Sequence, residues 1–196
     1  MKLLARACSI LTLLTAALFA TQAIAHDGKH PDAPNPSPNA TVSQEVGYTK
    51  ISLTFGSPGV KGRIIWGELV PYGDEDAKPW VAGANGTTTI EFEEDVKING
   101  KALPAGKYGL HVIPSEGDWI FIFSTDAGRF SIRSYTRDED ALRIAVTPEA
   151  AAHQEWLTYE FDKTDDLSAT LSLHWEKIKA GFTIEGPDHR KGEGKH

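Results

Sequence analysis

The sequence predicts an all-β chain folded as a single-domain antiparallel β-sandwich. Apolar and polar residues alternate over several stretches, which is the period of strands that bury one face. Short turn signals separate these stretches, above all Asn99-Gly100, the strongest short hairpin signal. Only one segment resembles a helix, so about nine or ten strands remain to form two packed sheets.

Four runs have an apolar residue at every second position and give the clearest strands: residues 51–55, 142–146, 157–161 and 169–175. The apolar face of the last run is formed by Ala169, Leu171, Leu173 and Trp175. Residues 162–168 join the last two runs as a hairpin. A further strand, "WIFIFS", lies between the turns "SEGD" and "DAG".

At most one short helix is expected, near residues 148–155, within the segment "TPEAAAHQEW". Thr147 is placed to cap it, Pro148 suits the first helical position, and three alanines follow. The segment therefore differs from the alternating runs on both sides of it.

The ends of the chain differ from the sandwich domain, which we place at residues 42–186. Residues 1–25 have the basic start, short apolar run and small-x-small ending of a cleaved signal peptide. Residues 26–41 predict a flexible Pro-rich arm, and residues 187–196 a flexible tail. We therefore expect a protein exported to the periplasm or extracellular space, without a transmembrane segment in its mature chain.

The net charge of the mature chain restricts the partners that the protein can bind. The signal peptide holds two of the 20 basic residues and none of the 27 acidic ones, so the mature chain has 18 against 27, a formal charge of −9. This charge argues against nucleic acid and anionic membranes. The only cysteine, Cys8, leaves with the signal peptide, so neither disulfides nor a thiolate nucleophile are expected. A small molecule, a glycan or an envelope protein remains as the partner.

A loop with unusual composition, "VPYGDEDAKPWVAGANG", precedes a predicted strand and offers Tyr72, Trp80 and Asn85 as candidate ligand contacts. The favoured interpretation is structural. Gly83 and Gly86 permit tight turns, and Trp80 is the one large apolar side chain that can anchor a polar loop in the core. The loop is then a latch ahead of the strand.

The five tryptophans do not favour a sugar-binding surface. We expect Trp156 and Trp175 in the core or at its margin, and Trp66 and Trp119 in apolar strands. Trp80 is then the only exposed one, whereas sugar platforms need several exposed rings that can stack on a sugar.

Histidines offer an alternative function. Cleavage after Ala25 gives His26 a free amine beside its imidazole, a chelate that suits Cu(II), with His30 close by. His111 is a candidate third ligand, and His153 and His174 are further ones. We expect no cofactor, with copper as the alternative.

Catalytic signatures are absent from the sequence: no Gly-x-Ser-x-Gly elbow, no His-Glu-x-x-His and no phosphate-binding glycine loop. Acidic clusters such as residues 74–76 and 138–140 are interpreted as solvated strand ends. No catalytic residue is therefore assigned. The expected function is a non-enzymatic binding or envelope-associated protein. An enzyme whose buried acid, base or nucleophile meets only in the fold is the other alternative.

Several quoted stretches resemble one family: "TFGSPGVKGRIIWGELVPYG", "WVAGANGTTTIEFEEDVKINGKALPAGKYGLHVIPSEGDWIFIFSTD", "ALRIAVTPE" and "WLTYEFD". Over nearly all of residues 42–184 the chain is similar to the bacterial exported proteins grouped as domain of unknown function 2911. The resemblance implies export and a single domain, but no activity. Relatives tend to have arginines where this chain has Ser57 and Val81. An anion site built from those guanidiniums should therefore be missing here.

Overall fold

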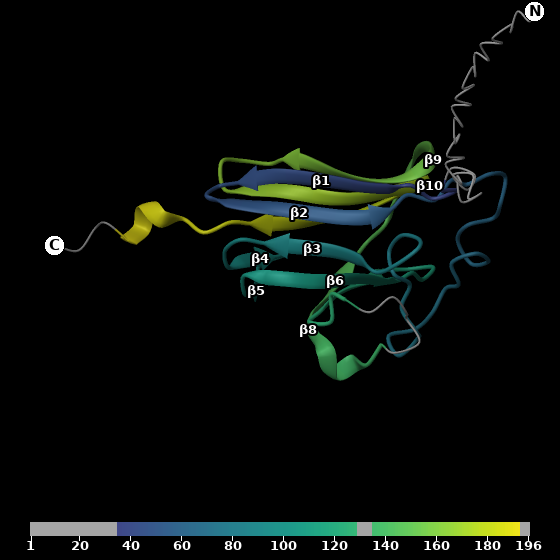
Figure 1. Ribbon diagram of the computed structural model, residues 1–196, viewed down its shortest axis with the longest axis horizontal. Coiled ribbons are helices and arrows are strands. Elements are labelled where there is room, and N and C mark those ends of the chain that lie inside the picture. Colours follow the sequence, from purple (N-terminus) through teal and green to yellow (C-terminus); the bar gives the residue numbers. More distant parts are fainter. Residues whose placement is uncertain (1–34, 129–134, 193–196) are drawn as a thin grey trace, which may run out of the picture. The chain divides into compact units, whose positions relative to one another are not determined.

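The computed structural model describes residues 35–128 and 135–192, which form two antiparallel sheets (Figure 1). The first sheet has the order β1-β2-β3-β6-β7-β8. Its strands are β1 (Asn39–Val46), β2 (Thr49–Gly56), β3 (Thr88–Phe92), β6 (Gly106–Ile113), β7 (Trp119–Ser124) and β8 (Asp140–Val146).

The second sheet has the order β5-β4-β10-β9. Its strands are β4 (Val96–Ile98), β5 (Lys101–Leu103), β9 (Glu149–Lys163) and β10 (Ser168–Glu185). Two short 3-10 turns, η2 (Arg137–Glu139) and η3 (His189–Gly192), complete the described elements. The Asn99-Gly100 hairpin joins β4 to β5, with positive φ at both residues, as the sequence predicted. The all-β sandwich is confirmed.

The core lies between the sheets and is built from the alternating apolar residues. Phe121 and Phe123 of β7 both contact Phe182 of β10, with ring centroids 5.4 Å apart in each pair. Phe55 of β2 meets Tyr159 of β9 edge to face at 4.9 Å. The predicted inward face of residues 169–175 is at most 1% exposed. These contacts pack the inner faces of both sheets against each other.

The helical interpretation of residues 148–155 is wrong, because residues 149–155 belong to β9. Their backbone pairs with β10, for example Glu149 with Lys179 and Ala150 with Ile178. A helix of this length is marginal in water by itself. Strand pairing with the rest of the fold therefore overrides the helix propensity of the three alanines.

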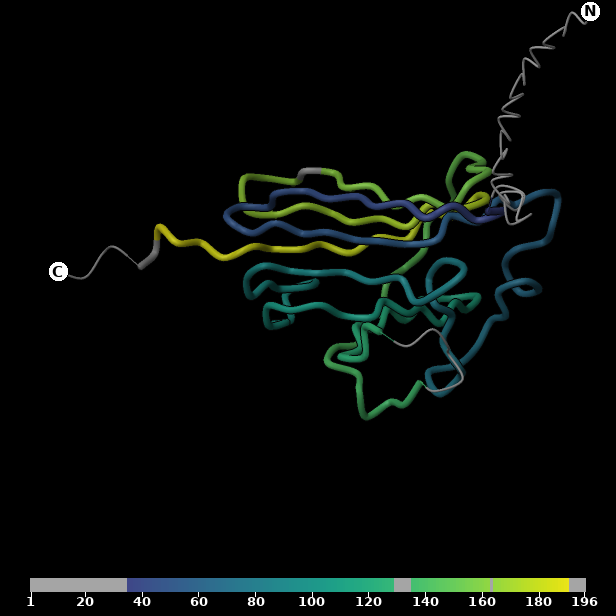
Figure 2. The backbone as a smooth tube through the Cα atoms, in the orientation of Figure 1, coloured from purple at the N-terminus to yellow at the C-terminus, as the bar shows by residue number. Residues whose placement is uncertain are grey.

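Strand β10 turns back on itself near Glu176, whose φ is 57°. The backbone N–H of Gly186 donates to the carbonyl of Leu167 at 2.8 Å, so the two ends of the strand meet. A straight strand of 18 residues would instead separate its ends by about 60 Å. The chain runs out and back in Figure 2, so β10 contributes two runs to its sheet.

Four tryptophans pack together where the loop between β2 and β3 enters the sandwich. Neighbouring rings of this tryptophan cluster lie 4.6 to 5.9 Å apart, and its members are Trp66, Trp80, Trp119 and Trp175. Trp80 is therefore partly buried. Trp66 was expected in a strand but lies in the loop. Trp156, expected in the core or at its margin, is 41% exposed, with the Lys61 ammonium 5.3 Å from its ring centre.

The segment around Trp80 joins the two sheets. Its backbone N–H and carbonyl pair with Val112 of β6 at 2.7 and 2.9 Å. The carbonyl of Ala82 accepts hydrogen bonds from the Thr88 hydroxyl of β3 at 3.0 Å and from the Tyr159 hydroxyl of β9 at 2.8 Å. Gly83 allows this approach, because a Cβ there would lie 2.7 Å from Thr88 Oγ1. The segment is a latch, as the favoured interpretation predicts.

Replacing Tyr159 with Phe should lower the free energy of unfolding by about 1–2 kcal/mol, because a buried hydrogen bond to Ala82 is lost. Urea unfolding measures the change. Tyr48→Phe is the matched control, since Tyr48 is 55% exposed and should change stability by less than about 0.5 kcal/mol. Equal effects of the two substitutions would contradict the role of the bond between the sheets.

Candidate functional site

The candidate site lies on the outer face of strands β6, β7 and β8. Leu110 and Val112 of β6 belong to the core, so His111 between them points outwards. Strand pairing places His111 opposite Ile122 of β7, and Ile122 opposite Arg143 of β8. His111 and Ile122 are nevertheless 5% and 0% exposed. This part of the outer face is therefore covered.

A register irregularity brings a carboxylate to the same face. The pairing of β7 with β8 shifts between Phe123, which faces Leu142, and Ser124, which faces Asp140. Strict alternation would place Asp140 on the same side as Leu142, which packs against the core. A bulge changes the direction of side chains, so Asp140 can join Arg143 on the outer face.

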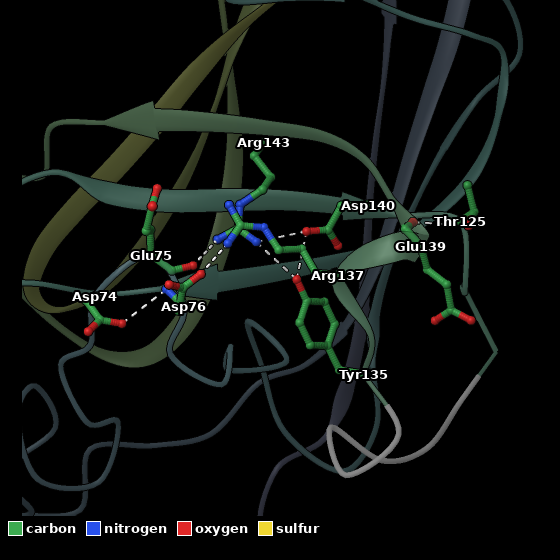
Figure 3. Close-up of polar contacts among 9 residues, drawn as sticks. All are labelled: Asp74, Glu75, Asp76, Thr125, Tyr135, Arg137, Glu139, Asp140 and Arg143. Atoms are coloured by element: carbon green, nitrogen blue, oxygen red, sulfur yellow. Dashed lines mark hydrogen bonds and ion pairs between the residues drawn. The ribbon is translucent and has the colours of Figure 1, made fainter.

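Tyr135, Asp140 and Arg143 form a closely bonded group (Figure 3). Oδ2 of Asp140 accepts from the Tyr135 hydroxyl at 2.7 Å and from Nη1 of Arg143 at 2.9 Å. Arg143 also donates to the Tyr135 oxygen at 3.2 Å. The side chain of Asp140 is 5% exposed and that of Arg143 is 19% exposed. The carboxylate is thus neutralised by a guanidinium in a mostly buried position.

The loop ahead of Trp80 covers this group. Nη2 of Arg143 donates to the carbonyl of Glu75 at 2.6 Å, and Arg137 forms an ion pair with Asp76 (Figure 3). Gly73 donates its backbone N–H to the carbonyl of Pro114 at 2.9 Å, just beyond β6. Residues 74–76, interpreted above as a solvated strand end, are exposed, but the Glu75 carbonyl and the Asp76 carboxylate also hold the covering segment in place.

Two buried atoms of the site have no hydrogen-bond partner among the described residues: Nδ1 of His111 and Oδ1 of Asp140. Tyr135 lies between their residues, since its ring centre is 5.8 Å from that of His111 and its hydroxyl bonds Asp140. Buried polar atoms normally find a partner in the protein, a water or a ligand. We call His111, Tyr135, Asp140 and Arg143 the outer-face site.

Gly109 has no side chain, which allows the backbone carbonyl of Asp126 to approach the sheet next to His111. A Cβ on Gly109 would lie 2.6 Å from the backbone oxygen of Asp126 and 3.2 Å from Nε2 of His111. Asp126 also donates its backbone N–H to the hydroxyl of Ser124 at 3.2 Å. The segment after β7 is therefore pressed onto the sheet beside the imidazole.

Burial controls the protonation of the site. It lowers the pKa of His111, and this outweighs the opposing effect of the Asp140 and Asp126 carboxylates. Burial, with the hydrogen bond to Asp140, raises the pKa of Tyr135 to about 12. The imidazole is thus neutral at pH 7 and Tyr135 keeps its proton.

The three residues that the sequence proposed for ligand binding differ in their surroundings. Trp80 belongs to the tryptophan cluster, and Nε1 of its indole donates to the carbonyl of Gly83 at 2.9 Å. Asn85 is exposed and donates its side-chain amide to the carbonyl of Ser37. Tyr72 is 40% exposed on the same loop. Trp80 and Asn85 therefore serve the packing of the loop.

Of the proposed metal ligands, His111 lies in the outer-face site, while His26 and His30 lie outside the described residues. Nε2 of His174 lies 2.9 Å from the carbonyl of Ala152, and His153 lies beside Glu155. Over residues 35–128 and 135–192, no three His, Cys, Asp or Glu side chains come together as a metal site.

Sequence reasoning missed Tyr135, Asp140 and Arg143. Arg143 was visible as a polar residue on an alternating strand, but such residues usually face solvent. Asp140 belonged to an acidic cluster that resembled a solvated turn. The one usable signal was His111, a polar residue inside the apolar run "GLHVIP".

A concavity of about 830 Å³ lies beside the hairpin between β9 and β10, and its lining includes none of the outer-face residues. Its acidic lining is bonded locally: Oδ1 of Asp165 accepts the backbone N–H of Leu167 at 2.7 Å, and Asp188 accepts from Arg190 at 2.8 Å. These contacts account for Asp165 and Asp188, whereas the outer-face site holds two buried atoms without a partner among the described residues, so it is the stronger candidate.

Replacing Arg143 with Met should destabilise the protein by about 2–4 kcal/mol, because the buried Asp140 carboxylate would lose its counter-charge. Arg137→Met is the matched control. Its ion pair with Asp76 is exposed, with 53% and 74% of the two side chains accessible, and such pairs contribute about 0–1 kcal/mol. Chemical unfolding compares the two variants. Similar losses would show that Arg143 is no more than a surface residue.

Acid should destabilise the wild type more than a His111→Gln variant. As the pH falls from about 7.5 to about 5.5, the unfolded state, with a histidine pKa near 6.5, binds a proton first. The pKa of His111 is lowered in the folded state. The stability that the neutral imidazole contributes above pH ~6.5 is therefore lost as the pH falls through the pKa of the folded state.

Urea unfolding at the two pH values measures this loss. His153→Gln should retain the pH dependence of the wild type, since the His153 side chain is 48% exposed. An equal loss of stability in wild type and His111→Gln would mean that His111 does not remain neutral in the fold.

Comparisons with known proteins agree with the sequence resemblance. No curated protein and no solved structure matches the chain. The family described as "Protein of unknown function (DUF2911)" matches residues 37–184, which include every strand of the outer-face site. The match covers more than half of the chain, and the protein therefore belongs to the DUF2911 family.

Proposed function

We propose that the mature protein is an exported binding protein that holds a small polar molecule at the outer-face site. One observation carries the proposal: Nδ1 of His111 and Oδ1 of Asp140 are buried without a partner among the described residues. A buried polar group without a partner costs about 1–3 kcal/mol, and more for a charged group. A ligand that supplies both partners recovers this cost, which favours its binding.

The surroundings suit binding more than catalysis. Tyr135 and Arg143 are bonded to each other and to Asp140, which fixes their positions. A Tyr135 pKa of about 12 disfavours the phenolate at neutral pH, the form that a nucleophilic role would use. Strands β6 and β8 supply three of the four side chains, and sites on strands hold their geometry well.

Export is the second part of the proposal. Residues 1–25 have the features of a signal peptide, which supports secretion to the periplasm or beyond. In the part of the chain that the structure describes, no helix has the length and apolar character needed to span a bilayer. The formal charge of −9 after cleavage suits a partner other than nucleic acid.

A thermal-shift screen of a chemically broad library of small molecules tests binding, using the mature chain that begins at His26. A ligand at about 100 times its Kd stabilises the folded state by about 2.7 kcal/mol, which raises the Tm by several degrees. The shift should disappear in Asp140→Asn, which exchanges the unpartnered acceptor for a donor. It should persist in Asp118→Asn, because Asp118 is exposed and bonds Thr147.

Two results would contradict the proposal: no increase in Tm with any compound of the library, or an increase in Tm that persists in Asp140→Asn. Cu(II) belongs in the same screen. A copper-selective shift that is lost in His26→Ala and retained in Asp140→Asn would favour the copper-binding alternative, which remains a prediction.

A further inference from the structure

We propose that the outer-face site recognises an uncharged molecule through two of its hydroxyl groups, the chemistry of a sugar or polyol. This inference rests on the proposed binding function and names its ligand class. It follows from the hydrogen-bonding capacity of the two unpartnered atoms and from the charges around them.

Asp140 sets the first requirement. An ionised carboxylate only accepts hydrogen bonds, so the partner of Oδ1 must present an O–H or N–H group. The other oxygen, Oδ2, already accepts from Tyr135 and Arg143. A ligand that carries only acceptors is therefore excluded from this position.

His111 sets the second requirement. Nδ1 of a neutral imidazole donates in one tautomer and accepts in the other. A hydroxyl group can do either, so it satisfies Nδ1 in both tautomers. An ammonium group satisfies only one tautomer, and a carboxylate only the other. One hydroxyl for Oδ1 of Asp140 and a second for Nδ1 of His111 meet both requirements.

The charges around the site disfavour an ionic ligand. The guanidinium of Arg143 lies 2.9 Å from Asp140 and balances its charge, which leaves little attraction for a cation at Oδ1 of Asp140. An anion would meet the Asp140 carboxylate, while Arg143 directs Nη1 and Nη2 at Asp140, Tyr135 and the Glu75 carbonyl. Burying an additional unpaired charge is costly.

Access to the site is compatible with a small ligand. The covering segment is held partly by the exposed ion pair between Arg137 and Asp76. Exposed pairs of this kind contribute little stability. A local opening of this segment that also releases the Arg143–Glu75 and Gly73–Pro114 hydrogen bonds gives a route to the buried atoms.

Calorimetric titration of the mature protein with charge-matched probes tests the ligand class. The neutral probes are glucose, galactose, mannose, xylose and myo-inositol. The charged probes are glucuronate, glucosamine and inorganic phosphate. We expect at least one neutral probe to bind, and both glucuronate and glucosamine to bind about tenfold or more weakly than that probe, since each buries a charge.

Variants connect the binding to the site. Asp140→Asn should weaken the neutral probe about tenfold or more, because its hydroxyl would face a donor, and Asp118→Asn should leave it unchanged. His111→Phe gives an independent check should Asp140→Asn unfold, because it removes Nδ1 and keeps an aromatic ring. Circular dichroism confirms that each variant is folded.

The outcomes separate this inference from the binding function. Binding of charged probes alone, abolished by Asp140→Asn, overturns the neutral class and keeps the function. A second outcome is that none of these probes binds but a library ligand binds and needs Asp140. If that ligand is charged or has no hydroxyl groups, the neutral class is overturned and the binding function is kept. If it is neutral and hydroxylated, it supports the inference. If no compound binds in either experiment, both the binding function and the ligand class are overturned, because water alone would then satisfy Oδ1 of Asp140 and Nδ1 of His111.

Discussion

The carbonyl of Ala82 accepts one buried hydrogen bond from each sheet, and the rest of the structure depends on this junction. Thr88 donates from β3 and Tyr159 from β9, so one backbone oxygen links the two layers. The adjacent Trp80 enters the tryptophan cluster and pairs with β6. Because the loop is fixed at this point, its earlier residues can lie across the outer face and contact Arg143.

Strands β6, β7 and β8 serve two purposes because their faces differ in chemistry. Their inner faces are apolar and pack against β10. Their outer faces carry a histidine, a serine, a carboxylate and a guanidinium in adjacent rows. The rigid core thus positions polar groups on its reverse side. Stability and binding are coupled there, since the unpartnered atoms cost stability that a ligand restores.

The sequence predicted the fold better than the site, for physical reasons. Strand alternation and the Asn99-Gly100 turn are local signals, and both were read correctly. The helix near residues 148–155 failed because pairing with β10 is a tertiary effect. The site depends on a bulge beside Asp140 and on a distant loop that reaches Arg143. Neither feature has a local pattern, so only the buried His111 was foreseen, and for a different role.

A high-resolution crystal structure of the mature protein, grown with a saturating ligand from the binding experiments, tests the central claim most directly. The account predicts ligand oxygens within about 3.2 Å of both Oδ1 of Asp140 and Nδ1 of His111, which is hydrogen-bond distance. Protein groups bonded to both atoms, with the ligand elsewhere, would contradict it. In that case the outer-face site would be a structural polar cluster and not a binding site.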